Sequence, residues 1–188
     1  MFYKTLFAFG ATALISAPAM AHSGHDVSSL VSGLTHPLLG LDHLLALFAI
    51  AVWGSRQNQM PSTRLMTVFL AVMALGGVLG MMNLALPGVE SMILVSVLAL
   101  GLLVAGQVHL SMIAGITMTA AIAMVHGMAH GTEIAGANAL PYVAGYLISC
   151  AALLAAGRFA GQWINTRPRL ALATGSAVTL SGAGIALS

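Results

Sequence analysis

The stretch from His36 to His43 contains three side chains that bind metal ions or exchange protons. It reads His36-Pro37-Leu-Leu-Gly-Leu-Asp42-His43 and opens an apolar run that continues to Trp53. Proline is favoured at the first position of a helix, so we expect Pro37 there and His36 as the cap residue. Because His36 and His43 are seven residues apart, their imidazoles would project from nearly the same face of that helix. The carboxylate of Asp42 would offset the partial positive charge of the helix N-terminus.

A second stretch carries two imidazoles and a carboxylate near the end of a later apolar run. It reads His126-Gly127-Met-Ala-His130-Gly131-Thr-Glu133. His126 and His130 are four residues apart and therefore stack on one helix face. Glu133 joins that face if the helix continues through Gly131, and lies on a loop just outside if the helix breaks there. The negative end of the helix dipole would favour a cation at this place.

These ligand types narrow the choice of metal without fixing it. Imidazole with carboxylate suits nickel, copper, zinc, cobalt or iron better than magnesium or calcium. Thiolate ligands are not expected, because the only cysteine, Cys150, lies in an apolar run as a packing residue. Most of the 12 methionines should also be packing residues. His109 lies outside both stretches and is interpreted as a solvated loop residue rather than an exit ligand.

A simpler alternative is that these polar groups only pair with neighbouring helices. The chain has 7 histidines and 4 acidic residues. The two stretches together contain four of these histidines and two of these acidic residues. An ionisable group at mid-membrane costs about 2.5–3.5 kcal/mol on insertion scales, and such groups persist where they pair or work. Their concentration at two points favours metal or proton handling over structural pairing.

The composition places these stretches in a membrane protein. Of the 188 residues 59% are hydrophobic and 5% are charged, whereas a soluble domain carries about 25% charged residues. So few charges cannot cover a water-facing surface. The net charge is +2, and the sequence has no basic patch that would bind a nucleic acid. It also has no glycine-rich loop that ends in Lys-Ser or Lys-Thr and would bind ATP. We therefore expect an all-α membrane protein.

The N-terminus has the pattern of a cleaved secretory signal peptide. Lys4 supplies the positive start, an apolar core follows, and residues 19–21 (Ala-Met-Ala) fit the cleavage rule. We therefore expect residues 1–21 to be removed. Residues 22–188 would then form a single six-helix transmembrane domain. Its mature N-terminus would carry a secondary metal-collecting group made of His22, His25 and Asp26.

Six later segments approach the length of about 20 residues that a membrane span requires, although the third is short. The six predicted spans are approximately 36–53, 65–86, 91–106, 109–130, 139–157 and 169–187. Several glycines have the spacing that lets membrane helices approach closely. These predicted packing glycines are Gly76 and Gly80 in the second span and Gly175, Gly182 and Gly184 in the sixth.

The arginines indicate how these spans are oriented. Cytoplasmic loops are enriched in Arg and Lys. The loops after the first and fifth spans carry Arg56, Arg64, Arg158, Arg167 and Arg169. Both loops should therefore be cytoplasmic, with the mature N-terminus and the C-terminus in the periplasm. The start of the first span and the end of the fourth would then meet at the outer face.

The two stretches together resemble the HupE/UreJ family of hydrogenase and urease accessory proteins. The resemblance rests on His-x5-Asp-His from His36 to His43 and on His-Gly-x-Ala-His-Gly-x-Glu from His126 to Glu133. It extends to the signal, the histidine-rich mature N-terminus and the six spans. Val125 stands where the family usually has an aromatic residue. The resemblance implies uptake of nickel for nickel enzymes, although some members are associated with other metals.

We therefore predict a bacterial inner-membrane permease that takes up a divalent transition metal, with nickel as first choice, from the periplasm into the cytoplasm. It would not be an enzyme and would hold no prosthetic group, because the metal is its cargo. Delivery would serve maturation of a hydrogenase or urease. The predicted metal site consists of His36, Asp42, His43, His126, His130 and Glu133.

Three alternatives remain open from the sequence. The same permease could carry cobalt or copper. An intramembrane zinc hydrolase could use Glu133 as its base, although no His-Glu-x-x-His arrangement is present. A metal sensor or chaperone would bind without transport. The expected partners are the metal ion and the lipid bilayer, with no nucleic acid; a homo-oligomer and downstream nickel-enzyme maturation proteins are compatible with this interpretation.

Overall fold

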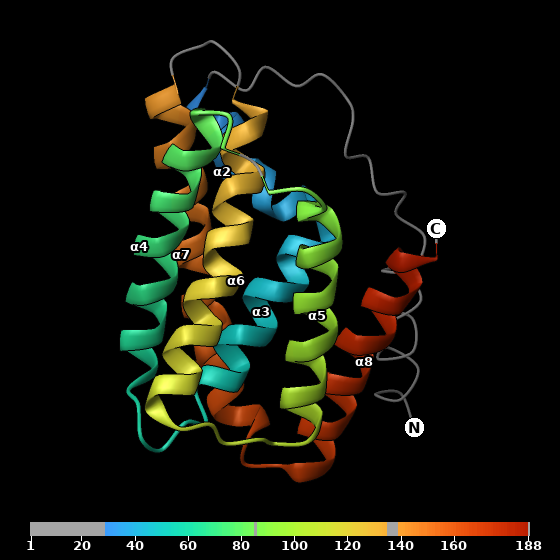
Figure 1. Ribbon diagram of the computed structural model, residues 1–188. Helices are drawn as coiled ribbons and strands as arrows, with labels where there is room; N and C mark the ends of the chain where they lie inside the picture. The colour runs from blue at the N-terminus through green and yellow to red at the C-terminus, as the bar shows by residue number, and fades with distance from the viewer. Residues whose placement is uncertain (1–28, 85, 135–138, 188) are drawn as a thin grey trace.

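The computed structural model describes residues 29–84, 86–134 and 139–187, and every regular element among them is an α-helix (Figure 1). The predicted signal peptide and the group His22, His25 and Asp26 lie outside the described residues. The helices are α2 (Leu30–Leu39), α3 (Leu41–Gly54), α4 (Ser62–Met81), α5 (Val89–Ala105), α6 (Met112–Glu133), α7 (Ala139–Ile164) and α8 (Pro168–Ala186). The predicted all-α class is therefore confirmed for the described part of the chain.

Three helices, α4, α6 and α7, are long and apolar enough to cross a membrane. The pair α2 and α3 adds a fourth candidate if its two helices are counted as one broken span. Helix α5 is apolar but only 17 residues long, and α8 has 19 residues with more small and polar side chains. The structure thus supports three to four of the six predicted spans by length and composition. From α3 to α8 successive helices alternate in direction (Figure 1).

The first predicted span is not one straight helix beginning at His36. Helix α2 begins at Leu30, is capped by Ser29, and carries Pro37 in its interior. It ends at Gly40, and α3 leaves at an angle of 78°. The predicted cap role of His36 was therefore wrong, and so was the shared helix face of His36 and His43. Pro37 cannot donate a backbone hydrogen bond, and Gly40 adopts an extended conformation, which together permit the break.

Helix α3 is the central element of the bundle. Its residues from Ala49 to Gly54 are all buried, so this part of the helix has no polar face. A helix that is apolar on every side must be surrounded by other helices. Helices α2, α4, α5, α7 and α8 all contact it. This central position brings the start of α3, with Asp42 and His43, into the interior near one end of the bundle.

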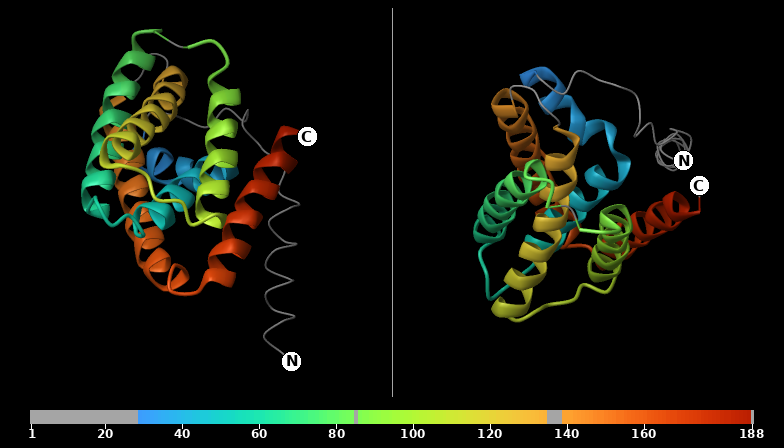
Figure 2. Two further views of the ribbon diagram at one scale, coloured as in Figure 1. Left: turned by 60° about the horizontal axis from the view of Figure 1, so that its bottom comes forward. Right: turned by 45° about the horizontal axis from the view of Figure 1, so that its top comes forward.

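Glycines allow the helices to approach one another closely. A Cβ atom added to Gly127 of α6 would overlap the backbone of Met73 and Gly77 in α4. Gly76 and Gly80 face α6 in the same way, which confirms their predicted packing role. Gly175 and Gly182 of α8 pack against α5, whereas Gly184 faces open space, so its predicted packing role was wrong. Figure 2 shows α8 beside α5 at the edge of the bundle.

The two ends of the bundle differ in their polar residues. The arginines lie along the loops that join α3 to α4 and α7 to α8 or in the neighbouring helix turns, and we call this the arginine end. Arg56 donates a hydrogen bond to the carbonyl of Asn165, and Arg158 donates one to Ser62. The opposite end holds α2, the start of α3 and the last turn of α6, and we call it the histidine end (Figure 1).

Candidate metal site

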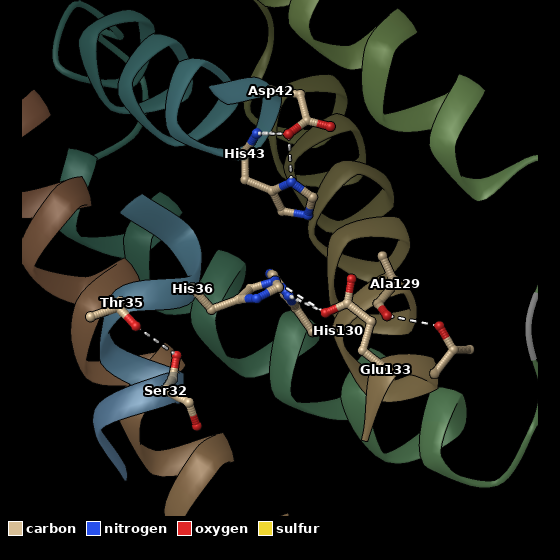
Figure 3. Close-up of polar contacts among 9 residues, drawn as sticks. Ser32, Thr35, His36, Asp42, His43, Ala129, His130 and Glu133 are labelled. Carbon is tan, nitrogen blue, oxygen red and sulfur yellow. Dashed lines mark hydrogen bonds and ion pairs between the residues drawn. The ribbon is translucent and has the colours of Figure 1, made fainter. Parts of the chain in front are cut away.

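The six predicted site residues come together at the histidine end. Helix α2 supplies His36, α3 supplies Asp42 and His43, and α6 supplies His126, His130 and Glu133. The ring centroid of His130 lies 4.8 Å from that of His36 and 4.7 Å from that of His43. The ring centroid of His43 lies 5.1 Å from that of His126. The four imidazoles therefore form one continuous cluster, which Figure 3 shows in part.

The outer part of this cluster consists of His36, His130 and Glu133. Nε2 of His36 lies 3.1 Å from Oε2 of Glu133, and Nδ1 of His130 lies 4.0 Å from the same oxygen (Figure 3). The three residues offer ligand atoms that are all within 4.8 Å of one another. Two donors that each lie about 2.1 Å from one ion are at most about 4.2 Å apart. Three donors around one ion lie closer together than this limit, so a contraction of about 1 Å in the longest separation would let the three share an ion.

Helix α6 reaches Glu133 without a break, so Gly127 and Gly131 do not end it. Instead these glycines press against α4 and hold the histidine-bearing face of α6 toward α2 and α3. His130 is 1% exposed, whereas the side chains of His36 and Glu133 are 30% and 39% exposed. The outer part thus runs from the surface into the interior.

The inner part of the cluster is the pair His43 and His126. Nδ1 of His126 lies 2.9 Å from the carbonyl oxygen of Ile122, so an Nδ1–H donates there. Nδ1 of His43 lies 2.9 Å from Oδ1 of Asp42. In both residues Nε2 is buried and has no hydrogen-bond partner among the described residues. A neutral imidazole with Nδ1 protonated presents a lone pair at Nε2, which is the atom that binds a metal.

Asp42 acts on His43 and does not point into the cluster. Its Oδ1 accepts hydrogen bonds from the backbone N–H of His43, at 2.8 Å, and from the ring Nδ1 of the same residue (Figure 3). A carboxylate that accepts the second ring proton of a metal-binding histidine fixes its tautomer and orientation. Asp42 thus has the geometry of a residue that positions His43, and its predicted role as a metal ligand stays a prediction.

Two tyrosines of α7 line the cluster, and sequence reasoning missed them. The ring of Tyr146 stacks on His130 at 5.0 Å between centroids, and the ring of Tyr142 meets His36 edge-on at 5.8 Å. Both tyrosines are fully buried. They are four residues apart, and they are two of the three tyrosines in the chain. That spacing in an otherwise apolar segment was the available signal.

His109 lies apart from this cluster, in the loop between α5 and α6 at the arginine end, and is exposed. This position agrees with its interpretation as a loop histidine. Cys150 is buried and unpaired by disulfide, as expected of a packing residue.

Comparison with known proteins supplies the context of the cluster. The sequence model described as "HupE / UreJ protein" matches residues 10–187. Protein HupE of Rhizobium leguminosarum bv. viciae is 38% identical over 184 residues, covering 92% of this chain and 93% of its own length. No solved structure matches this chain.

Proposed function

Since the chain belongs to the HupE/UreJ family, we propose that it is an inner-membrane permease that carries a divalent transition metal ion, with nickel as first choice, from the periplasm to the cytoplasm. HupE/UreJ is a transporter-type accessory family and not a family of enzymes. Its association with nickel and cobalt transport gives the general role, and several apolar helices fit a multi-pass inner-membrane protein.

The observation that carries this proposal is the convergence of four imidazoles and two carboxylates from α2, α3 and α6. Ionisable groups are costly inside a membrane and collect where ions or protons move. His36, His130 and Glu133 suit the entry of the ion, because two of them reach the surface. His43 and His126 suit the next step inward, because both offer a buried Nε2 lone pair. His130 contacts residues of both groups.

The charges of this cluster suit a divalent cargo. With neutral imidazoles, the carboxylates of Asp42 and Glu133 supply two negative charges. An ion of charge +2 would leave the loaded cluster near neutral, which reduces the cost of holding it in a low-dielectric interior. Imidazole nitrogen and carboxylate oxygen are ligands that nickel and cobalt accept, and no thiolate is needed.

The membrane potential can drive this uptake if the histidine end faces the periplasm. The arginine end is then cytoplasmic, as the enrichment of arginine in cytoplasmic loops favours. Moving a divalent ion inward across 100 mV is favourable by about 4.6 kcal/mol. Since 1.4 kcal/mol corresponds to tenfold, this supports an accumulation of roughly 10³-fold. Such an accumulation is sufficient for a trace metal and needs no ATP.

Uptake into proteoliposomes tests the proposal. Purified protein would be reconstituted with an inside-negative potential, and entry of Ni²⁺, Co²⁺, Cu²⁺ and Zn²⁺ would be followed separately. We expect nickel or cobalt to enter the wild type and not His43→Ala, with His109→Ala as the matched control that retains uptake. Entry of zinc or copper alone would overturn the choice of metal. No flux of any metal through a protein that still binds one would favour the hydrolase or sensor.

A further inference from the structure

The histidine cluster continues along one face of α6 toward the arginine end. Residues Gly115, Thr119, His126 and His130 project within about 60° of one another around a helix of 3.6 residues per turn. Thr119 lies roughly 10 Å below His126 along that axis. The side chain of Thr119 is fully buried, and its hydroxyl has no hydrogen-bond partner among the described residues. A buried hydroxyl without a hydrogen-bond partner costs free energy, so the presence of threonine at this position has to be explained.

This face of α6 is closed at Gly115 by two large side chains. A Cβ atom added to Gly115 would lie 2.6 Å from Cε of Met60 and 3.3 Å from the Cη2 atom of Trp53. Met60 and Trp53 are each 1% exposed. The indole of Trp53 thus sits at the arginine end of the same face that carries the histidines at the other end.

Side-chain hydrogen bonds hold this indole against the loop between α5 and α6. Nε1 of Trp53 donates to the carbonyl oxygen of Val108 at 2.9 Å. Nε2 of Gln57 donates to the same oxygen at 3.2 Å, and Oε1 of Gln57 accepts from the backbone N–H of Leu110 at 3.1 Å. Gln57 is buried, and its amide group clamps the loop to the end of α3.

This clamp differs in kind from the contact between α4 and α6. In the α4–α6 contact the glycines of each helix lie directly against the backbone of the other, so the two helices are closely packed. The loop instead is held by a few hydrogen bonds that water can replace. Gln107, inside the loop, has a φ of 50°, a left-handed conformation that is unfavourable for a residue with a side chain. Backbone hydrogen bonds from Gln107 to the carbonyl of Val104 and from Val108 to that of Leu103 accommodate this conformation as a cap of α5. The side chains of Trp53 and Gln57 attach this capped end of α5 to the end of α3.

We propose that Trp53, held by Gln57 on the α5–α6 loop, is the inner gate of the metal route, and that Thr119 lines this route between the histidine cluster and the gate. The inference rests on the proposed transport function and names residues beyond the metal site. When the loop moves away, the indole loses its hydrogen bond to Val108 and can leave Gly115. The ion, with its water, then passes the Thr119 hydroxyl, which gains a partner during passage.

Labelling of a single cysteine tests the gate without measuring transport. Thr119→Cys would be introduced into a Cys150→Ala background, and inside-out vesicles would be treated with a membrane-impermeant thiol reagent. The closed gate predicts slow labelling. Adding Gln57→Ala removes the loop clamp and should speed labelling about tenfold. Trp53→Phe, which keeps an aromatic ring and removes the Nε1 donor, should do the same if Gln57→Ala fails to fold.

Asn165→Ala provides the matched control. Asn165 donates hydrogen bonds to Val52 and Ser55 on another side of the same end of α3, so its loss leaves the α5–α6 loop untouched. We expect this variant to leave the labelling rate unchanged. Equal labelling in the Gln57→Ala, Trp53→Phe and Asn165→Ala proteins would overturn the gate.

Thr119→Val tests the route itself, because valine keeps the shape and removes the hydroxyl. We expect metal uptake to fall about tenfold while binding of Ni²⁺ to the purified protein is unchanged. Unchanged uptake would remove Thr119 from the route. Failure of the wild type to take up any metal would defeat the proposed function, whereas wild-type uptake with an unresponsive gate would defeat this inference alone.

Discussion

The inner imidazoles of the cluster are fixed by neighbours that leave one nitrogen of each unused. His43 directs Nδ1 at Asp42, and His126 directs Nδ1 at the carbonyl oxygen of Ile122. Both Nε2 atoms are buried without a partner among the described residues. Because a buried polar atom is normally satisfied, this pair of lone pairs supports the proposed metal site.

Removal of the carboxylate that orients His43 should weaken metal binding. Asp42→Ala takes away both hydrogen bonds to His43, and loss of such an outer partner typically lowers metal affinity 10–100-fold. Titration of Ni²⁺ into the detergent-purified protein would measure the effect. His109→Ala is the control, since His109 is exposed at the arginine end. Equal affinities of Asp42→Ala and wild type would remove Asp42 from the site.

At the residue scale, the sequence predicted which side chains meet, because ionisable residues are scarce in this chain and their places stand out. It predicted Asp42 as a ligand, which stays a prediction, and residue type alone could not reveal the hydrogen bond of Asp42 to His43. It missed Tyr142 and Tyr146, because tyrosines in a membrane segment often serve only as packing or interfacial residues. Their contact with His36 and His130 depends on how α7 packs against α2 and α6.

The break between α2 and α3 brings His36 into the histidine cluster. It turns α2 so that the ring of His36 lies beside that of His130, whereas in one straight helix His36 would lie about two turns before His43. The sequence could not reveal this, since Pro37 is acceptable both at a helix start and inside a broken span. The direction of α2 is set by its close packing on α7. Gly33 of α2 lies against the backbone of Tyr142, and Gly145 of α7 lies against the backbone of α2.

A side chain at the break should disturb the site without unfolding the protein. Gly40 has φ −81° and ψ 104°, which any residue can adopt. A Cβ atom there would lie 3.2 Å from Nδ1 of His43 and 3.3 Å from Oδ1 of Asp42. We expect Gly40→Ala to lower Ni²⁺ affinity by roughly tenfold or less, with thermal unfolding close to that of the wild type. A large drop in unfolding temperature would contradict this account.

The close contact of α4 with α6 predicts a different result at Gly127. Alanine there must displace the backbone of α4, and overpacking of this kind costs about 1–3 kcal/mol. Thermal unfolding in detergent should therefore show Gly127→Ala as clearly destabilised. Gly184→Ala is its control, because a Cβ at Gly184 meets nothing within 4 Å. Equal unfolding temperatures of the two variants would mean that the glycine contact does not hold α6 in place.

At the scale of the whole molecule, the alternating helices bring two distant stretches to one end and the arginines to the other. The pattern of apolar runs predicted most helix positions to within a few residues, because each run is bounded by glycine, proline or charged residues. It did not predict α3 as the buried centre. All runs are similarly apolar, and only the packed bundle reveals which one is surrounded.

The orientation of the bundle can be tested by cysteine labelling in spheroplasts. In a Cys150→Ala background, Glu90→Cys would lie at the histidine end and Thr166→Cys at the arginine end; both positions are exposed. An impermeant thiol reagent added outside spheroplasts should label Glu90→Cys directly. Thr166→Cys should react only after the membrane is opened. The reverse pattern would place the histidine cluster in the cytoplasm and turn the proposed uptake into export.

Equilibrium binding of Ni²⁺ to the purified protein, compared between wild type, His130→Ala and His109→Ala, tests most directly that the cluster is one metal site. His130 contacts His36, His43 and Glu133, so its loss should weaken binding by about 100-fold, or 2.7 kcal/mol. His109, exposed at the other end, should be replaceable without effect. Wild-type affinity in His130→Ala, or equal losses in both variants, would contradict the account.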